Sequence, residues 1–102
     1  MNICVFGAGA IGGYIGCSLR KAGANISLIA RGPHKEAIEK NGLTLITGNT
    51  SETFNLKVTE NTNELETQDY IIIGVKAHAI PGIVEDLKPL LNENTTILSA
   101  VN

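Results

Sequence analysis

The sequence predicts a Rossmann-type α/β domain, in which a parallel β-sheet is covered by helices on both faces. Three observations support this prediction. Segments rich in β-prone residues alternate along the 102-residue chain with segments that carry a helical repeat of apolar residues. The strand segments are apolar on both faces, as buried parallel strands are. A glycine-rich turn, GAGAIGG, joins the first strand segment to the first helix segment, which is where this fold places its nucleotide-binding turn.

The first strand and the first helix flank this turn. Residues 2–6, NICVF, form a short apolar run that predicts a buried strand. Apolar residues then recur on one helical face, at Ile11, Ile15, Leu19 and Ala22. Gly23 follows them and suits the end of a helix, because glycine readily adopts the left-handed conformation found there.

The next segments alternate again between strand and helix. Residues 25–30, NISLIA, predict a second buried strand, and residues 32–42 predict a helix with Pro33 in its first turn. Residues 43–46, LTLI, predict the third strand of the sheet. Residues 48–59 alternate apolar and polar side chains. This pattern predicts an extra strand or hairpin after the third strand, with one face in solvent.

The last part of the chain repeats the strand–helix–strand order. Residues 61–68 are polar and predict a short helix or loop, whereas residues 69–75, DYIIIGV, predict a central strand. Residues 80–91 predict a helix with one apolar side, formed by Ile83, Val84, Leu87, Leu90 and Leu91. Residues 95–101 predict a last buried strand. We expect residues 1–102 to form one domain, truncated or isolated, because a complete doubly wound sheet usually continues.

Composition and charge exclude several classes of protein. The formal net charge is −2, so the chain lacks the basic character of a nucleic-acid-binding or membrane-surface protein. No apolar run is long enough to span a bilayer, and the N-terminus does not resemble a signal peptide. Cys4 and Cys17 lie in apolar segments and have no metal-ligand spacing with His34 or His78. We therefore expect buried reduced thiols, no metal site and a cytoplasmic protein.

The glycine turn carries the dinucleotide-binding motif G-x-G-x-x-G, formed by Gly7, Gly9 and Gly12. The first glycine permits the sharp turn, the second lets a pyrophosphate approach the backbone, and the third lets the helix pack closely on the strand. N–H groups at the start of the helix would bind the phosphate charge. The alternative is that glycines here serve only close packing, which is our interpretation of Gly16.

Arg31 follows the second strand at the position where an NAD-binding domain carries Asp or Glu. A guanidinium group matches a phosphate in charge and geometry, so the sequence predicts binding of NADP(H). A charge-assisted hydrogen bond would give a preference of about 10- to 150-fold over NAD(H). The alternative is a solvated loop arginine. His34 and Lys35 are interpreted as exposed helix residues rather than as further phosphate ligands.

Two further candidate site residues lie at the ends of strands. Lys76 directly follows the predicted central strand, and Asn102 follows the last one. Ligands of open α/β sheets bind outside the carboxyl ends of the strands, so both residues are expected at the cofactor crevice. His78 is interpreted as a partly exposed residue near the start of a helix.

The chain resembles the ketopantoate reductase (2-dehydropantoate 2-reductase) family over its whole length. The resemblance is carried by residues 1–16, 30–32 and 75–77 and by the terminal SAVN. It implies the N-terminal, NADP(H)-binding third of a nucleotide-binding oxidoreductase that reduces 2-dehydropantoate with NADPH, a step of pantothenate and coenzyme A biosynthesis. It assigns the cofactor pyrophosphate to Gly7, Ala8, Gly9, Ala10, Ile11 and Gly12.

The resemblance also implies roles for three other residues. Arg31 would bind the 2′-phosphate, and Lys76 would lie beside the nicotinamide ribose and the substrate, where it assists catalysis. Asn102 would contact both cofactor and substrate. The principal acid, a lysine, belongs to a helical C-terminal domain outside this chain, so we expect this domain alone to be inactive. We expect a small keto acid as substrate, no nucleic-acid or membrane partner, and self-association as a homodimer.

Two other functions stay open. The chain could belong to another two-domain NADP-dependent hydroxy-acid dehydrogenase, or it could be a stand-alone module that binds NADP(H) without chemistry. The segment VKAHA favours the ketopantoate reductase interpretation over the first alternative. A natural stop after Asn102 would favour the second.

Overall fold

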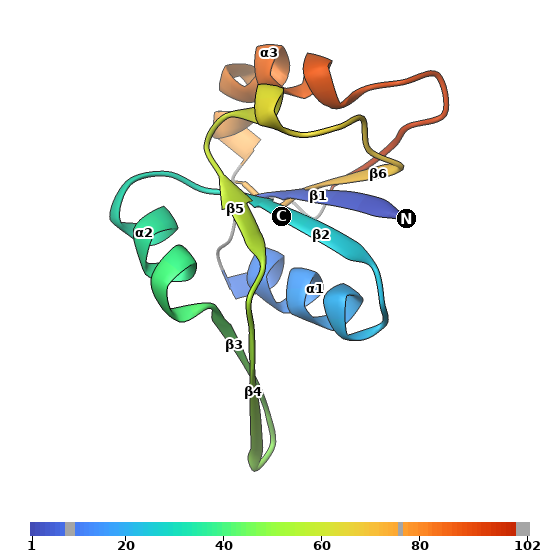
Figure 1. Cartoon of the computed structure of the whole chain (residues 1–102). Helices are drawn as coiled ribbons and strands as arrows, with labels where there is room; N and C mark the ends of the chain where they lie inside the picture. Colours follow the sequence, from blue (N-terminus) through green and yellow to red (C-terminus); the bar gives the residue numbers. More distant parts are fainter. Residues whose placement is uncertain (8–9, 76, 100–102) are drawn as a thin grey trace.

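A computed structural model describes residues 1–7, 10–75 and 77–99, and for residues 10, 11, 77 and 78 it describes the backbone alone. Five parallel strands form one sheet in the order β5-β2-β1-β6-β7 (Figure 1). These strands are β1 (Asn2–Phe6), β2 (Asn25–Ile29), β5 (Lys57–Thr59), β6 (Tyr70–Ile73) and β7 (Thr96–Ser99). The first strand lies in the centre, as in a Rossmann-type sheet, so the predicted fold class is confirmed.

Helical segments cover both faces of this sheet (Figure 1). One face is covered by α1 (Ala10–Lys21) and α2 (Gly32–Asn41), whose Cys17 and Ile38 are buried in one core cluster. The opposite face is covered by shorter segments, whose Ile83 and Leu90 belong to a second cluster. These segments are η1 (Thr62–Glu64), η2 (Ala77–Ile83), α3 (Val84–Leu87) and η3 (Lys88–Leu90).

The central strand β1 divides its side chains between the two clusters. Ile3 and Val5 point to the α1 and α2 face, whereas Cys4 and Phe6 point to the opposite face. All four side chains are buried. This two-faced burial explains why the segment is apolar without alternation, since a parallel strand between two helical layers has no face in solvent.

The extra strand predicted after the third strand is present as part of a hairpin, but the assignment of residues 43–46 to the parallel sheet was wrong. β3 (Leu43–Thr47) and β4 (Thr50–Phe54) form a separate antiparallel ribbon that projects from the body (Figure 1). The third place in the parallel sheet is taken by β5, which pairs with β2. The reason lies in the alternation within β3, where Leu43 and Leu45 pack against the core while Thr44 and Ile46 are exposed.

Two predictions for the last part of the chain also need correction. Residues 77–90 form two 3₁₀ segments around the short α3 instead of one α-helix. Pro81, Gly82 and Pro89 explain the interruption, because proline and glycine disfavour a continuous helix. As a result Val84 and Leu91, which were expected on the buried side, are 48% and 41% exposed.

The strand β7 was expected to be buried, but all four of its residues are exposed. It pairs only with β6 and forms one edge of the sheet. Ile97 and Leu98, which point to opposite faces, are 45% and 48% exposed. Within the described residues, therefore, no helix buries either face of this strand.

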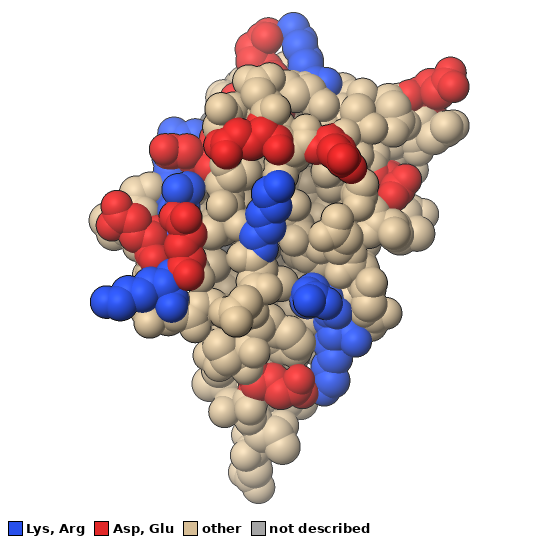
Figure 2. Space-filling view, viewed as in Figure 1, with Lys and Arg blue, Asp and Glu red and all other residues tan. Residues whose placement is uncertain are grey.

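Charged side chains are mixed over the face of the molecule shown in Figure 2, where basic and acidic groups lie next to one another. This distribution agrees with the net charge of −2. In the part of the chain that the structure describes, no helix is long and apolar enough to cross a membrane.

Candidate functional site

The turn between β1 and α1 is tightly built around two of the motif glycines. Gly7 has a φ of +90°, and a Cβ there would lie 3.0 Å from Val75 Cγ1. A Cβ on Gly12 would lie 1.9 Å from the carbonyl oxygen of Gly7, which is backbone and cannot give way. The turn and the first turn of α1 therefore require glycine at both positions, whatever ligand they bind.

Gly16 fits the packing role expected for it. A Cβ at this position would lie 3.3 Å from Leu28 Cδ2, at the contact between α1 and β2. Ala8 and Gly9 lie outside the described residues, and Ala10 and Ile11 are described only as the backbone that begins α1. Their expected contacts with a pyrophosphate stay predictions.

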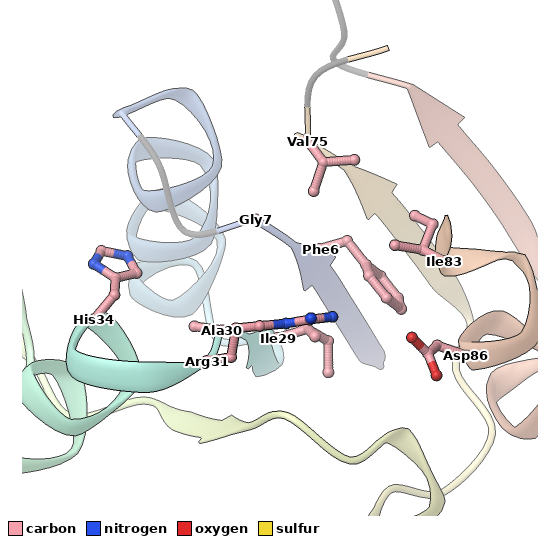
Figure 3. Close-up of a pocket in the computed structure, with 9 residues that line it drawn as sticks. All are labelled: Phe6, Gly7, Ile29, Ala30, Arg31, His34, Val75, Ile83 and Asp86. Atoms are coloured by element: carbon pink, nitrogen blue, oxygen red, sulfur yellow. The ribbon is translucent and has the colours of Figure 1, made fainter. Parts of the chain in front are cut away.

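A pocket of about 260 Å³ opens at the carboxyl ends of β1 and β2 (Figure 3). Backbone hydrogen bonds bring its edges together, because Gly7 N–H donates to the Ile29 carbonyl oxygen at 3.3 Å and Gly74 N–H donates to that of Phe6 at 2.8 Å. The pocket is lined by residues from four separate segments: Phe6, Gly7, Ile29, Ala30, Arg31, His34, Val75, Ile83 and Asp86.

Arg31 lies where the sequence placed it, between β2 and α2. Its backbone is extended, with φ −142° and ψ 163°, and it serves as the N-cap residue of α2. Its guanidinium group reaches across the pocket (Figure 3). The side chain makes no hydrogen bond or ion pair within the described residues. This arginine is therefore available to an anionic ligand in the pocket.

The structure separates the two basic residues that follow Arg31. Lys35 donates to Glu39 Oε1 at 2.9 Å, and this hydrogen bond raises the pKa of Lys35. His34, by contrast, lines the pocket (Figure 3). Both were expected as exposed helix residues: His34 is exposed in α2 as expected but also lines the pocket, whereas Lys35 is half-buried. The signal for the position of His34 was its spacing of three from Arg31, which places it on the same side of the first helical turn.

Asp86 is a second pocket residue that sequence reasoning missed. It lies in α3, and its carboxylate points into the pocket from the side opposite Arg31 (Figure 3). The helical pattern of residues 80–91 could not have placed it, because the observed 3₁₀ segments change which side chains face the sheet.

Lys76 and Asn102, the two candidates at strand ends, lie outside the described residues. The strands that precede them do end at the expected edge, since Ile73 of β6 pairs with Phe6 of β1 and with Ser99 of β7. The side-chain position of His78 is likewise not described.

The two cysteines lie in the hydrophobic core, one in each core cluster. Cys4 and Cys17 are free and buried. Burial raises the pKa of the Cys4 thiol to about 12, and it also raises the pKa of Cys17. Among the described residues, no group of three or more His, Cys, Asp and Glu side chains could hold a metal ion.

Comparison with known proteins relates almost the whole chain to one family. Residues 3–102 match the family described as ketopantoate reductase PanE/ApbA. A protein named 2-dehydropantoate 2-reductase from Mesorhizobium japonicum is 39% identical over 103 residues, which cover 100% of this chain and 32% of that protein.

Solved structures agree with this relationship. The structure of 2-dehydropantoate 2-reductase from Geobacter metallireducens GS-15 has a TM-score of 0.91 and 32% identity, covering 100% of this chain and 34% of its own. The ternary structure of D-mandelate dehydrogenase with NADH and anilino(oxo)acetate has a TM-score of 0.88 and 28% identity. The match covers 100% of this chain and 33% of the dehydrogenase. The chain thus spans about a third of the length of these relatives.

Proposed function

This chain belongs to the ketopantoate reductase family, and we propose that it is the NADPH-binding part of a 2-dehydropantoate 2-reductase. The activity is proposed for a longer enzyme, because the chain spans about a third of its relatives. The observation that carries the proposal is the position of Arg31 beside a pocket at the carboxyl ends of β1 and β2.

The pocket suits the adenosine part of a dinucleotide. Phe6, Ile29 and Ile83 offer apolar walls to a flat ring. Its volume of about 260 Å³ lies below the range of about 300–1,000 Å³ typical of complete ligand sites, so it would hold one ring system rather than the whole cofactor. Gly7 lies on its lining, so a pyrophosphate attached to that adenosine would reach the start of α1. N–H groups there are unsatisfied by the helix itself.

The preference for a 2′-phosphate rests on Arg31. The segment that leaves β2 offers Ala30, Arg31 and Gly32, so no carboxylate stands ready to accept a ribose 2′-hydroxyl from this position. The guanidinium group has no partner within the described residues. A phosphate would satisfy both its charge and its fork of donors.

When bound, NADPH supplies the hydride that reduces a keto group. Within this chain we assign Lys76 to assist catalysis and Asn102 to orient cofactor and substrate, on the family resemblance. The strands before them end at the same sheet edge as Gly7. The principal acid and the residues that select the keto acid are assigned to the part of the enzyme beyond this chain.

A second candidate cofactor is NADH, because the D-mandelate dehydrogenase of similar fold was solved with NADH. Arg31 favours NADPH over this alternative. We also propose a cytoplasmic location, supported by two free buried cysteines. Self-association as a homodimer is supported by Ile97 and Leu98, which are exposed on β7.

The proposal is tested by titrating the chain with NADPH and NADH while following the fluorescence of the reduced nicotinamide. We expect tighter binding of NADPH by about 10- to 150-fold. Arg31→Ala should remove most of this difference, because it should weaken the binding of NADPH and leave the binding of NADH little changed. Lys35→Ala is the matched control, because Lys35 is engaged with Glu39. Equal affinities in the unaltered chain, or an Arg31→Ala variant that loses both cofactors equally, would contradict the proposal.

A further inference from the structure

Asp86 faces Arg31 across the pocket. Of the nine described residues that line it, Asp86 carries the one carboxylate. It lies in α3 and is half-buried. Figure 3 shows its carboxylate and the Arg31 guanidinium directed toward each other from opposite sides. The pocket therefore holds one positive and one negative charge that confront any ligand placed between them.

Neither the Asp86 carboxylate nor the Arg31 guanidinium has a side-chain partner among the residues that the structure describes. Within the described residues, Asp86 and Arg31 form no hydrogen bond or ion pair through their side chains, and they lie beyond the 4.0 Å limit of an ion pair with each other. The neighbouring acid behaves differently, because Glu85 accepts from Lys88 Nζ at 2.9 Å and is 82% exposed. Asp86 is thus the acid of α3 whose charge is directed at the pocket.

We propose that Asp86 is a specificity-determining residue that limits how strongly the pocket prefers a 2′-phosphorylated dinucleotide. This inference rests on the proposed binding of NADPH. A 2′-phosphate on Arg31 would bring further negative charge close to the Asp86 carboxylate, which repels it. The carboxylate also attracts the guanidinium group and so competes with the phosphate. Phe6, Ile29 and Ile83 line the same pocket, but Arg31 is exposed and Asp86 is half-buried, so water and salt screen both effects in part.

The effect is specific to one of the two cofactors. NADH carries a neutral 2′-hydroxyl in place of the phosphate, so it meets no such repulsion at this position. Asp86 therefore acts against Arg31 in the discrimination between NADPH and NADH. A weaker hold on the phosphate also favours release of the oxidised cofactor, a step that often limits turnover.

The test compares Asp86→Asn, which keeps the shape and removes the charge, with Glu85→Gln, which removes the same charge one residue away and outside the pocket. Dissociation constants for NADPH and NADH are measured by fluorescence titration of the whole chain, at low and at high salt. We expect Asp86→Asn to lower the dissociation constant for NADPH by about 3- to 10-fold and to change that for NADH by less than about 2-fold. The gain should shrink at high salt, because screening weakens the repulsion. Glu85→Gln should leave the ratio of the two constants unchanged.

Several results would overturn the inference. If the ratio of the NADPH and NADH dissociation constants is unchanged in Asp86→Asn, the charge of Asp86 does not act on the phosphate. If Asp86→Asn weakens the binding of both cofactors equally, Asp86 contacts a part of the molecule that they share, such as the adenine ring. Thermal unfolding monitors the fold of each variant, and Asp86→Ser gives an independent measure of the same ratio. If the unaltered chain binds NADH but shows no preference for NADPH, the proposed role of Arg31 fails first, and this inference fails with it.

Discussion

At the scale of single residues, Arg31 differs from three lysines in having no ion-pair partner within the described residues. Lys35 is held by Glu39 at 2.9 Å. Lys21 and Lys88 are likewise paired, with Glu52 at 2.6 Å and Glu85 at 2.9 Å. Arg31 has no such partner within the described residues. Exposed pairs of this kind add little stability, but each of them leaves its lysine less available to an anionic ligand than Arg31 is.

Cys4 gives a prediction about alkaline stability. Its thiol is fully buried in the centre of the sheet, and burial raises its pKa from 9.0 to about 12. Above pH 9 the unfolded chain loses this proton while the folded chain keeps it, so the free energy of unfolding must fall as pH rises. We expect a fall of about 1.4 kcal/mol from Cys4 between pH 8 and pH 10. Urea unfolding at each pH measures it.

The comparison for this experiment is Cys4→Ala. The variant should be less stable at pH 8, because it leaves a small cavity in the core. It should, however, lose about 1.4 kcal/mol less than the unaltered chain when the pH is raised to 10. Equal pH dependence in the two proteins would show that the thiol ionises as easily in the folded state as in the unfolded one.

At the scale of secondary structure, the sequence predicted which segments are strands more reliably than how they pair. Residues 43–46 do form a strand, but it pairs with β4 instead of entering the parallel sheet. β5 contains a single apolar residue, Val58, whereas β3 contains three, so apolar content favoured the wrong segment as the third parallel strand. The choice depends on tertiary packing, because Leu43, Leu45 and Val58 all contact the same core cluster.

The start of α1 gives a prediction about the role of glycine in two positions of one helix. Gly12→Ala places a methyl group 1.9 Å from the Gly7 carbonyl oxygen, so α1 must shift away from the turn. We expect a loss of about 1–3 kcal/mol, as for other overpacked sites. Gly16→Ala meets Leu28 Cδ2 at 3.3 Å and Ile26 Cγ2 at 3.8 Å, both flexible side-chain atoms, and gains about 1 kcal/mol of helix propensity.

Thermal unfolding of the two variants measures this difference. Gly12→Ala should unfold at a clearly lower temperature than the unaltered chain, whereas Gly16→Ala should stay close to it. Both replace glycine by alanine within α1, so propensity cancels in the comparison. Two variants of equal stability would show that the turn adapts to a side chain at Gly12, and that its glycine is explained by a ligand alone.

At the scale of the whole molecule, the site is assembled from segments that are distant in the chain. The glycine turn and Arg31 could be predicted, because strand ends and a fixed motif position them in any fold of this topology. His34 could have been assigned from its spacing of three from Arg31, whereas the sequence offers no such signal for Asp86. Asp86 depends on how residues 77–90 cross the sheet, and its place follows from prolines that break the expected helix.

The same scale decides which steps of the proposed reaction this chain could carry out. The pocket offers Arg31 and apolar walls, and we expect these to suffice for binding the proposed cofactor. Reduction of a keto group also needs a proton donor at the developing alkoxide. The cation of this chain assigned to that region is Lys76, in an assisting role. Exclusion of water from the reacting atoms would require a cover over the carboxyl edge of the sheet.

We therefore predict that this chain binds NADPH but does not reduce 2-dehydropantoate at a measurable rate. The measurement follows NADPH oxidation by its absorbance, with and without 2-dehydropantoate, beside a full-length relative such as the 2-dehydropantoate 2-reductase of Geobacter metallireducens. The relative should turn over, and this chain should not, although titration shows its cofactor site filled. Turnover by this chain that disappears in Lys76→Ala would make Lys76 the principal acid, because no other domain would be there to donate the proton.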